Sequence, residues 1–158
     1  MNGSHLNIAE LIPHHGTMCL LDTIESWDER HILCTATSHR RNDNPLCDPS
    51  GLRAICAIEY GAQAIAAHSA LLRSPSGHGP VVGLLAAVRD LVTTQPYIHT
   101  IEGALTVRAD AVLTQEHGLM YLITVQGEGR TLLSGRVSVM LSPTEAQASP
   151  YAGVEDIP

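Results

Sequence analysis

The last third of the chain alternates between apolar and polar positions in the way that is typical of half-buried strands. The alternating segments cover residues 104–113, 119–126 and 131–141. In the middle segment the apolar positions are Leu119, Tyr121, Ile123 and Val125. Short turn-like stretches separate the three segments, as in an antiparallel meander. The pattern therefore predicts three consecutive antiparallel strands.

The first part of the chain predicts further strands and one short helix. Residues 30–38 alternate like the later segments, and residues 18–24 form a mostly apolar run that predicts a buried strand. Residues 8–12 predict a short helix that Asn7 caps. Residues 81–94 predict one or two more strands, interrupted by a polar Arg-Asp pair. These elements add strands on both sides of the centre of the chain.

One long helix is predicted over residues 52–73, which are apolar on nearly every side of the helix. A surface helix has a polar face, so this helix is expected to be wrapped by a sheet. Residues 74–80 predict a loop, and residues 142–158 predict a mobile C-terminal tail. We therefore expect one α+β domain over residues 1–141, an antiparallel sheet around one central helix.

Composition removes several classes of function. Hydrophobic residues make up 44% of the 158 residues, enough for one core, but there is no Phe and only one Trp. The formal net charge is −7, and this acidic balance, with few aromatic residues, argues against nucleic acid or an anionic membrane as partner. The basic residues are all Arg, and without Lys a Schiff-base mechanism is excluded.

The N-terminus shows no signal-peptide pattern, and the long helix carries charged and polar residues that argue against a membrane span. The expected setting is therefore soluble, reducing and cytoplasmic. The four cysteines form no Cys-x-x-Cys pair and the nine histidines show no ligand spacing, so we expect no metal site.

Glu59 is the residue whose placement suggests chemistry. On a helix its neighbours on the same side are Ile55, Cys56, Ala62 and Gln63, of which only Gln63 is polar. A carboxylate in such surroundings loses hydration, which favours a role in proton transfer. The structural alternative is a carboxylate that simply hydrogen-bonds to Gln63 or to the backbone.

Three stretches resemble a known family. Residues 11–22 (LIPHHGTMCLLD) resemble its opening pattern, residues 57–63 (AIEYGAQ) resemble its central-helix pattern, and residues 82–89 resemble the strand after that helix. The family is the hotdog-fold β-hydroxyacyl-ACP dehydratases. Within it the chain resembles the ApeP-like subgroup of aryl-polyene clusters, whose helix motif reads GIEYMAQ.

The resemblance implies a hotdog fold and a dimer, formed with a second copy or with another hotdog subunit. It implies a 3-hydroxyacyl thioester as substrate, carried on phosphopantetheine by an acyl carrier protein or coenzyme A, with no cofactor beyond that arm. Glu59 then serves as general acid and base, and Gln63 helps to orient it. Backbone N–H groups at the start of the central helix polarise the thioester carbonyl.

The chain departs from the family at the Gly-His-Phe-Pro motif, which supplies the catalytic histidine just before the helix. Residues 42–51 (NDNPLCDPSG) stand there and contain no histidine. Three alternatives could replace the missing histidine. His39 or His14 approaches Glu59, a partner subunit supplies a histidine, or Glu59 acts alone as carboxylates do in some hotdog thioesterases.

The candidate site residues are therefore Glu59, Gln63, His39 and His14, each with a structural alternative. His14 could brace the N-terminal turn, His39 could be a surface residue, and Gln63 could only satisfy Glu59. We predict a dehydratase-like protein of fatty-acid or polyketide-type synthesis. The alternatives are a non-catalytic partner subunit of a dehydratase and an acyl thioesterase.

Overall fold

The computed structural model describes residues 6–73 and 81–143. Within these residues six strands form one antiparallel sheet, in the order β1-β2-β4-β5-β6-β3. The strands are β1 (Thr23–Trp27), β2 (His31–Ala36), β3 (Val81–Thr93), β4 (Leu105–Gln115), β5 (Gly118–Gly127) and β6 (Arg130–Pro143). The predicted meander is confirmed as β4, β5 and β6. The predicted loop at residues 74–80 lies outside the described residues. The predicted tail starts too early, because residues 142 and 143 still belong to β6, and its remainder from residue 144 also lies outside the described residues.

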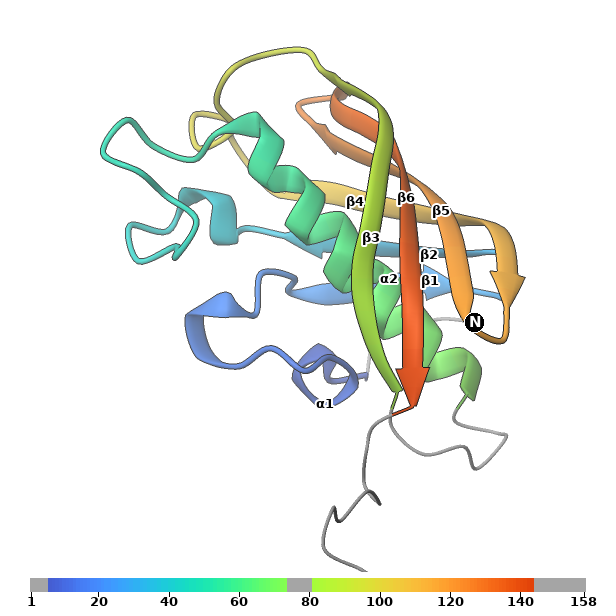
Figure 1. Cartoon of the computed structure of the whole chain (residues 1–158). Coiled ribbons are helices and arrows are strands. Elements are labelled where there is room, and N and C mark those ends of the chain that lie inside the picture. The colour runs from blue at the N-terminus through green and yellow to red at the C-terminus, as the bar shows by residue number, and fades with distance from the viewer. Residues whose placement is uncertain (1–5, 74–80, 144–158) are drawn as a thin grey trace, which may run out of the picture.

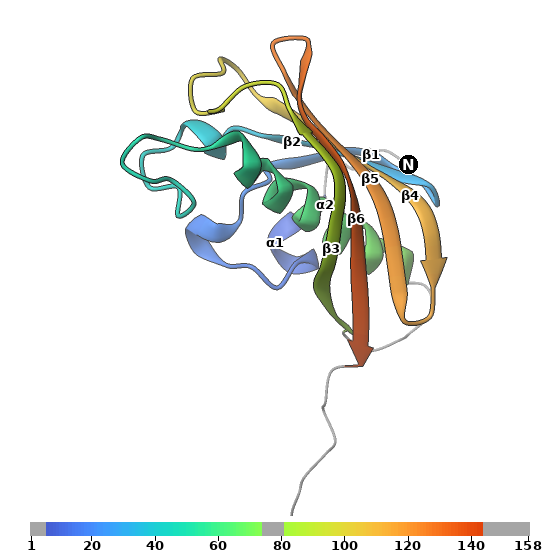
Figure 2. The same cartoon turned by 45° about the horizontal axis from the view of Figure 1, so that its top comes forward.

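The long helix α2 (Ala57–Arg73) lies across one face of the curved sheet, and the short helix α1 (Ile8–Leu11) packs beside it (Figures 1 and 2). The alternating apolar side chains of β5 are buried against this helix side of the sheet. The predicted α+β arrangement of an antiparallel sheet around one helix is confirmed. By length and composition the helical residues 54–73 could span a membrane, but half of that window is buried inside the protein, as in the core helix of a soluble protein.

The central helix begins later than the sequence pattern predicts. Residues 54–56 form a 3₁₀ turn, and the α-helix starts at Ala57. The backbone before it is extended because Leu52 accepts a hydrogen bond from Ile98 N–H and Ala54 donates one to Pro96. These bonds pin the entry to the helix against the chain at residues 96–98.

The entry to the helix also needs a glycine. Gly51 has a φ of +113°, and an added Cβ would lie 2.1 Å from Cε1 of His99. Only a residue without a side chain fits there. The Asp48 side chain does not cap the helix; it accepts a hydrogen bond from Ser50 N–H and pairs with Arg53.

The predicted strand at residues 18–24 is wrong over its first part. Residues 16–18 form a 3₁₀ turn, and β1 begins only at Thr23. The physical reason is that Met18 and Leu20 use backbone groups to bind the Gln63 side chain rather than a neighbouring strand. This segment is therefore attached to the helix.

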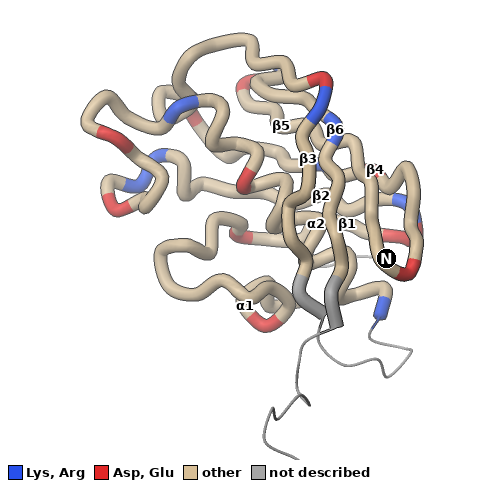
Figure 3. The backbone as a smooth tube through the Cα atoms, viewed as in Figure 1, with Lys and Arg blue, Asp and Glu red and all other residues tan. Residues whose placement is uncertain are grey.

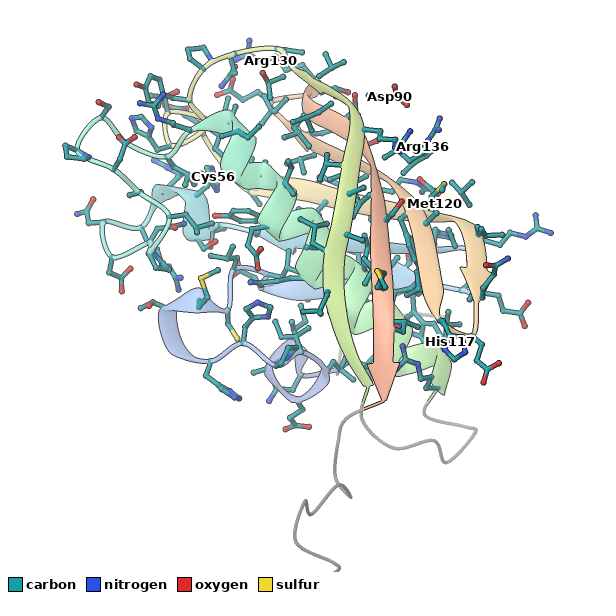
Figure 4. All side chains as sticks on the ribbon, viewed as in Figure 1. Cys56, Asp90, His117, Met120, Arg130 and Arg136 are labelled. Atoms are coloured by element: carbon teal, nitrogen blue, oxygen red, sulfur yellow. The ribbon has the colours of Figure 1, made fainter. Side chains whose placement is uncertain are left out.

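The polar pair at residues 89–90 does not divide β3 into two strands. It produces a bulge, where the register against β6 shifts and Asp90 takes a φ of +53°. Arg136 of β6 lies 3.4 Å from the Asp90 carboxylate, and Figure 4 labels both residues. A similar register shift near the end of β4 leaves Leu113 exposed, although its alternation predicted the buried face.

Candidate active site

Glu59 lies in the first turn of α2, with its side chain 31% exposed. Its Oε1 atom accepts a hydrogen bond from Nε2 of Gln63 at 3.3 Å and lies 3.1 Å from Nε2 of His14. No hydrogen bond to Oε2 is formed within the described part of the chain. The carboxylate is thus held through one oxygen while the other keeps its lone pairs.

Gln63 is completely buried and uses every hydrogen-bonding group of its amide. Its Oε1 accepts from Leu20 N–H at 3.0 Å. Its Nε2 donates to the carbonyl of Met18 at 2.8 Å as well as to Glu59. The side chain therefore orients Glu59 and fastens the segment before β1 to the helix, so the structural and the orienting interpretations both apply.

His14 reaches Glu59 from the far end of that fastened segment. Its carbonyl accepts a hydrogen bond from the Cys19 thiol at 3.0 Å, which closes the turn around Gly16. His14 thus approaches Glu59 within one chain, at 3.1 Å. Helical spacing gives no sign of the pair, because the two residues are far apart in the sequence.

His39 is not brought to this site. It is completely buried in a 3₁₀ turn (Ser38–Arg40) after β2, and its Nε2 lies 3.1 Å from the carbonyl oxygen of Ile101. Since a carbonyl only accepts, Nε2 carries the proton of the neutral ring. Burial lowers the pKa of His39. The residue is a core histidine rather than a surface one.

The sequence pattern does not predict a polar cluster that lies beside the site. The Tyr60 hydroxyl lies 2.9 Å from Ser38 Oγ and accepts from the Asn44 amide at 3.0 Å. Ser38 in turn donates to the carbonyl of Leu20. Burial raises the pKa of Tyr60, so the hydroxyl stays protonated and serves packing. Asn44 is buried, and its amide anchors the loop before the helix by donating to the Ser38 carbonyl.

Cys34 and Cys56 offer no activated nucleophile to this site. Burial raises the pKa of Cys34 to about 12, and it also raises the pKa of Cys56, which lies at the start of the central helix (Figure 4). Over residues 6–73 and 81–143, no three His, Cys, Asp or Glu side chains are grouped to hold a metal ion.

Basic residues near the site are mostly engaged. Arg53 pairs with Asp48 at 2.8 Å and lies over the Tyr97 ring. Arg41 donates to the carbonyl of Thr17 at 2.9 Å. Acidic positions lie among the basic ones in this part of the backbone (Figure 3). The side chain of Arg40 is exposed.

An antiparallel sheet around one long central helix is the hotdog fold. The chain belongs to the ApeP-like family, described as ApeP dehydratase, which it matches over residues 6–150. The family supports a dehydratase-like function for the chain.

Solved structures support the fold. The dehydratase heterocomplex ApeI:P from Xenorhabdus doucetiae contains a chain with a TM-score of 0.79 and 22% identity, covering 89% of this chain and 93% of that one. A mutant thioesterase from Pseudomonas aeruginosa has a TM-score of 0.56 and 15% identity, covering 77% and 81%. AziG from S. sahachiroi has a TM-score of 0.52 and 22% identity, covering 76% and 89%. A comparison with curated proteins gave no match.

Proposed function

We propose that the protein is a 3-hydroxyacyl-thioester dehydratase of fatty-acid or polyketide-type synthesis, with Glu59 as its acid and base. Family membership supports the reaction class. The observation that carries the assignment to Glu59 is the orientation of its carboxylate, which is held through Oε1 by Gln63 and His14 and unengaged at Oε2. A free oxygen on a positioned carboxylate is what a proton-transfer step needs.

The reaction balances with one carboxyl group. Glu59 removes the proton from C2 of the acyl chain, and charge develops on the thioester oxygen. The electron pair at C2 forms the double bond to C3 while the C3–O bond breaks. The carboxyl group returns its proton to the departing hydroxide, so that water leaves and Glu59 is again a carboxylate. The steps in reverse hydrate an enoyl thioester.

The start of the helix is suited to the charge on the thioester oxygen. The turn that precedes α2 has no side-chain cap, and Ile55 N–H donates no hydrogen bond within the described residues. A free amide at a helix N-terminus stabilises negative charge. This amide lies one helical turn before Glu59, which suits a substrate that spans both.

The proposed substrate hangs from phosphopantetheine on an acyl carrier protein or coenzyme A, in the cytoplasm. The ApeP-like family suggests an aryl-polyene pathway. The elimination moves no electrons to or from the chain, so it requires no redox cofactor. Docking of an acidic carrier by arginines receives limited support, because Arg41 and Arg53 already have partners, although Arg53 is exposed like Arg40.

The test is hydration of a crotonyl thioester, followed as loss of the enoyl absorbance. We expect Glu59→Gln to lower kcat/KM by about 100-fold or more, because an amide cannot accept the C2 proton. Glu116→Gln, at an exposed carboxylate on the β4–β5 turn, is the matched control and should keep full activity. Full turnover by Glu59→Gln would remove Glu59 from the mechanism.

A second candidate is a non-catalytic subunit that pairs with a competent dehydratase. The similar chain from Xenorhabdus doucetiae belongs to a heterocomplex, and here the edge strand β3 exposes Leu84 and Leu85, which are 58% and 51% exposed. We propose that this edge meets a second hotdog chain, either a copy or a different subunit. Two results together would favour this candidate. The chain alone would show no activity, and its complex with a second hotdog chain would be equally active with and without Glu59→Gln.

Thioesterase activity is the third candidate, because the chain shares its fold with a thioesterase. The same assay separates it, because hydrolysis releases free thiol from a saturated acyl thioester whereas dehydration and hydration release none.

A further inference from the structure

His14 and Gln63 act on the same oxygen of Glu59, from two different elements. Gln63 lies one helical turn further along α2, and His14 belongs to the segment before β1. That segment is fixed at both ends, by the Cys19 thiol on the His14 carbonyl and by the Gln63 amide on Met18 and Leu20. The imidazole is therefore held in place and does not depend on its own rotamer alone.

The two ring nitrogens of His14 have different surroundings. Nε2 faces the carboxylate at 3.1 Å, whereas Nδ1 is buried and finds no hydrogen-bond partner within the described residues. A proton on Nδ1 would be a buried donor without an acceptor, which is unfavourable. The neutral ring therefore carries its proton on Nε2 and donates it to Oε1 of Glu59. Among the residues that the structure describes, Nδ1 has no partner to which a proton could pass.

We propose that His14 is a positioning residue whose Nε2–H holds Oε1 of Glu59 and leaves Oε2 to exchange protons with the substrate. The standard dehydratases take a histidine from the loop before the helix, whereas His14 comes from the chain before β1. This inference rests on the proposed dehydratase function for its kinetic consequence. The hydrogen bond itself is independent of that function.

The kinetic test compares His14→Gln with His14→Ala in the hydration assay. The amide nitrogen of Gln can occupy the place of Nε2 and donate to Glu59, but it cannot change its charge. We expect His14→Ala to lower kcat/KM by about 10- to 100-fold, because the carboxylate is misplaced. His14→Gln should stay within about 5-fold of wild type and keep the shape of the pH–rate profile, since its amide preserves the hydrogen bond to Oε1 of Glu59.

The matched control is His15→Gln, because His15 is the exposed neighbour of His14 and should be dispensable. A His14→Gln variant as weak as His14→Ala, with a changed pH profile, would show that the ring itself transfers protons and would overturn the positioning role. Wild-type activity in His14→Ala would remove any role. Circular dichroism of each variant checks that it is folded.

A second readout needs no turnover. Nitrogen-15 NMR of the imidazole should show His14 with its proton on Nε2, and Glu59→Ala should shift that resonance because its acceptor is lost. A proton on Nδ1, or a resonance that ignores Glu59→Ala, would overturn the inference. If wild type hydrates no thioester, the proposed function fails while this measurement still decides the role of His14.

Discussion

At the scale of single residues, the Gln63 side chain connects the parts of the site. Its amide joins the backbone of Met18 and Leu20 to the Glu59 carboxylate, and all three contacts are made by a side chain without exposed surface. One amide group both orients Glu59 and attaches the segment before β1 to the helix, so a substitution of Gln63 affects both roles. Stability and activity are therefore coupled at this residue.

Replacing Gln63 with Leu should destabilise the protein as well as slow it. The change leaves Leu20 N–H and the Met18 carbonyl buried without partners, at a cost of about 2 to 5 kcal/mol in the free energy of unfolding. Urea denaturation measures this difference. Gln126→Leu, on an exposed position of β5, is the control and should change stability by no more than about 0.5 kcal/mol. An unaltered midpoint for Gln63→Leu would show that these backbone groups find other partners.

At the scale of elements, the site depends on how closely α2 approaches the sheet. At Gly61, two residues after Glu59, an added Cβ would lie 2.8 Å from Cδ1 and 3.0 Å from Cγ2 of Ile123. Ile123 is buried in the middle of β5. The helix therefore rests on the strand through a residue without a side chain, and this contact sets the height of Glu59 above the sheet.

A double-mutant cycle between Gly61 and Ile123 tests this contact. Gly61→Ala should lower the free energy of unfolding by about 1 to 3 kcal/mol through overpacking. The higher helix propensity of Ala offsets about 1 kcal/mol of this loss. Ile123→Val should cost about 0.5 to 1.5 kcal/mol. The double variant should lose less than the sum, by about 0.5 kcal/mol or more, because removing Cδ1 makes room for the new methyl group.

The control cycle pairs Gly61→Ala with Ile24→Val, which makes the same deletion in β1, where the losses should add. Additive losses in the Gly61 and Ile123 cycle would show that the helix shifts without resistance, and that this contact does not position Glu59.

At the scale of the whole molecule, buried histidines connect the layers. His68 of α2 donates from Nε2 to the carbonyl of Asp28 at 2.7 Å, after β1, and its Nδ1 accepts from the Tyr121 hydroxyl of β5 at 2.8 Å. Burial lowers the pKa of His68 and raises the pKa of Tyr121 to about 12, so both stay neutral. His39 is a second neutral histidine in the core, and burial lowers its pKa as well.

These histidines make the fold sensitive to mild acid. Because their pKa is below 6.5 in the folded state, the unfolded chain binds more protons as the pH falls through that value. The free energy of unfolding should therefore be greatest above about pH 6.5 and decrease below it, by up to about 1.4 kcal/mol per pH unit for each histidine. Denaturation at several pH values between about 7.5 and 5 measures the slope.

His68→Gln should reduce this slope, whatever its effect on stability at neutral pH. His117→Gln, at an exposed position on the β4–β5 turn, should leave it unchanged. A wild-type stability that is constant over this range would contradict the assignment of buried neutral histidines.

Local periodicity was sufficient for much of the architecture. The meander, the central helix and the neighbouring places of Glu59 and Gln63 follow from repeats of two residues in a strand and of three to four in a helix. Those repeats depend on backbone geometry, which neighbouring residues share. The family motifs then connected Glu59 with thioester chemistry.

Contacts between distant segments could not be obtained that way. The bond from His14 to Glu59, the attachment of residues 18–20 to Gln63 and the late start of the helix all depend on where irregular backbone finds its hydrogen-bond partners. Side-chain alternation does not report such partners, because it records only which face of an element is apolar. The sequence alone therefore identified Glu59 as the acidic residue of the site. Only the tertiary structure identified His14 as its partner, because the segment before β1 must first pack against the helix.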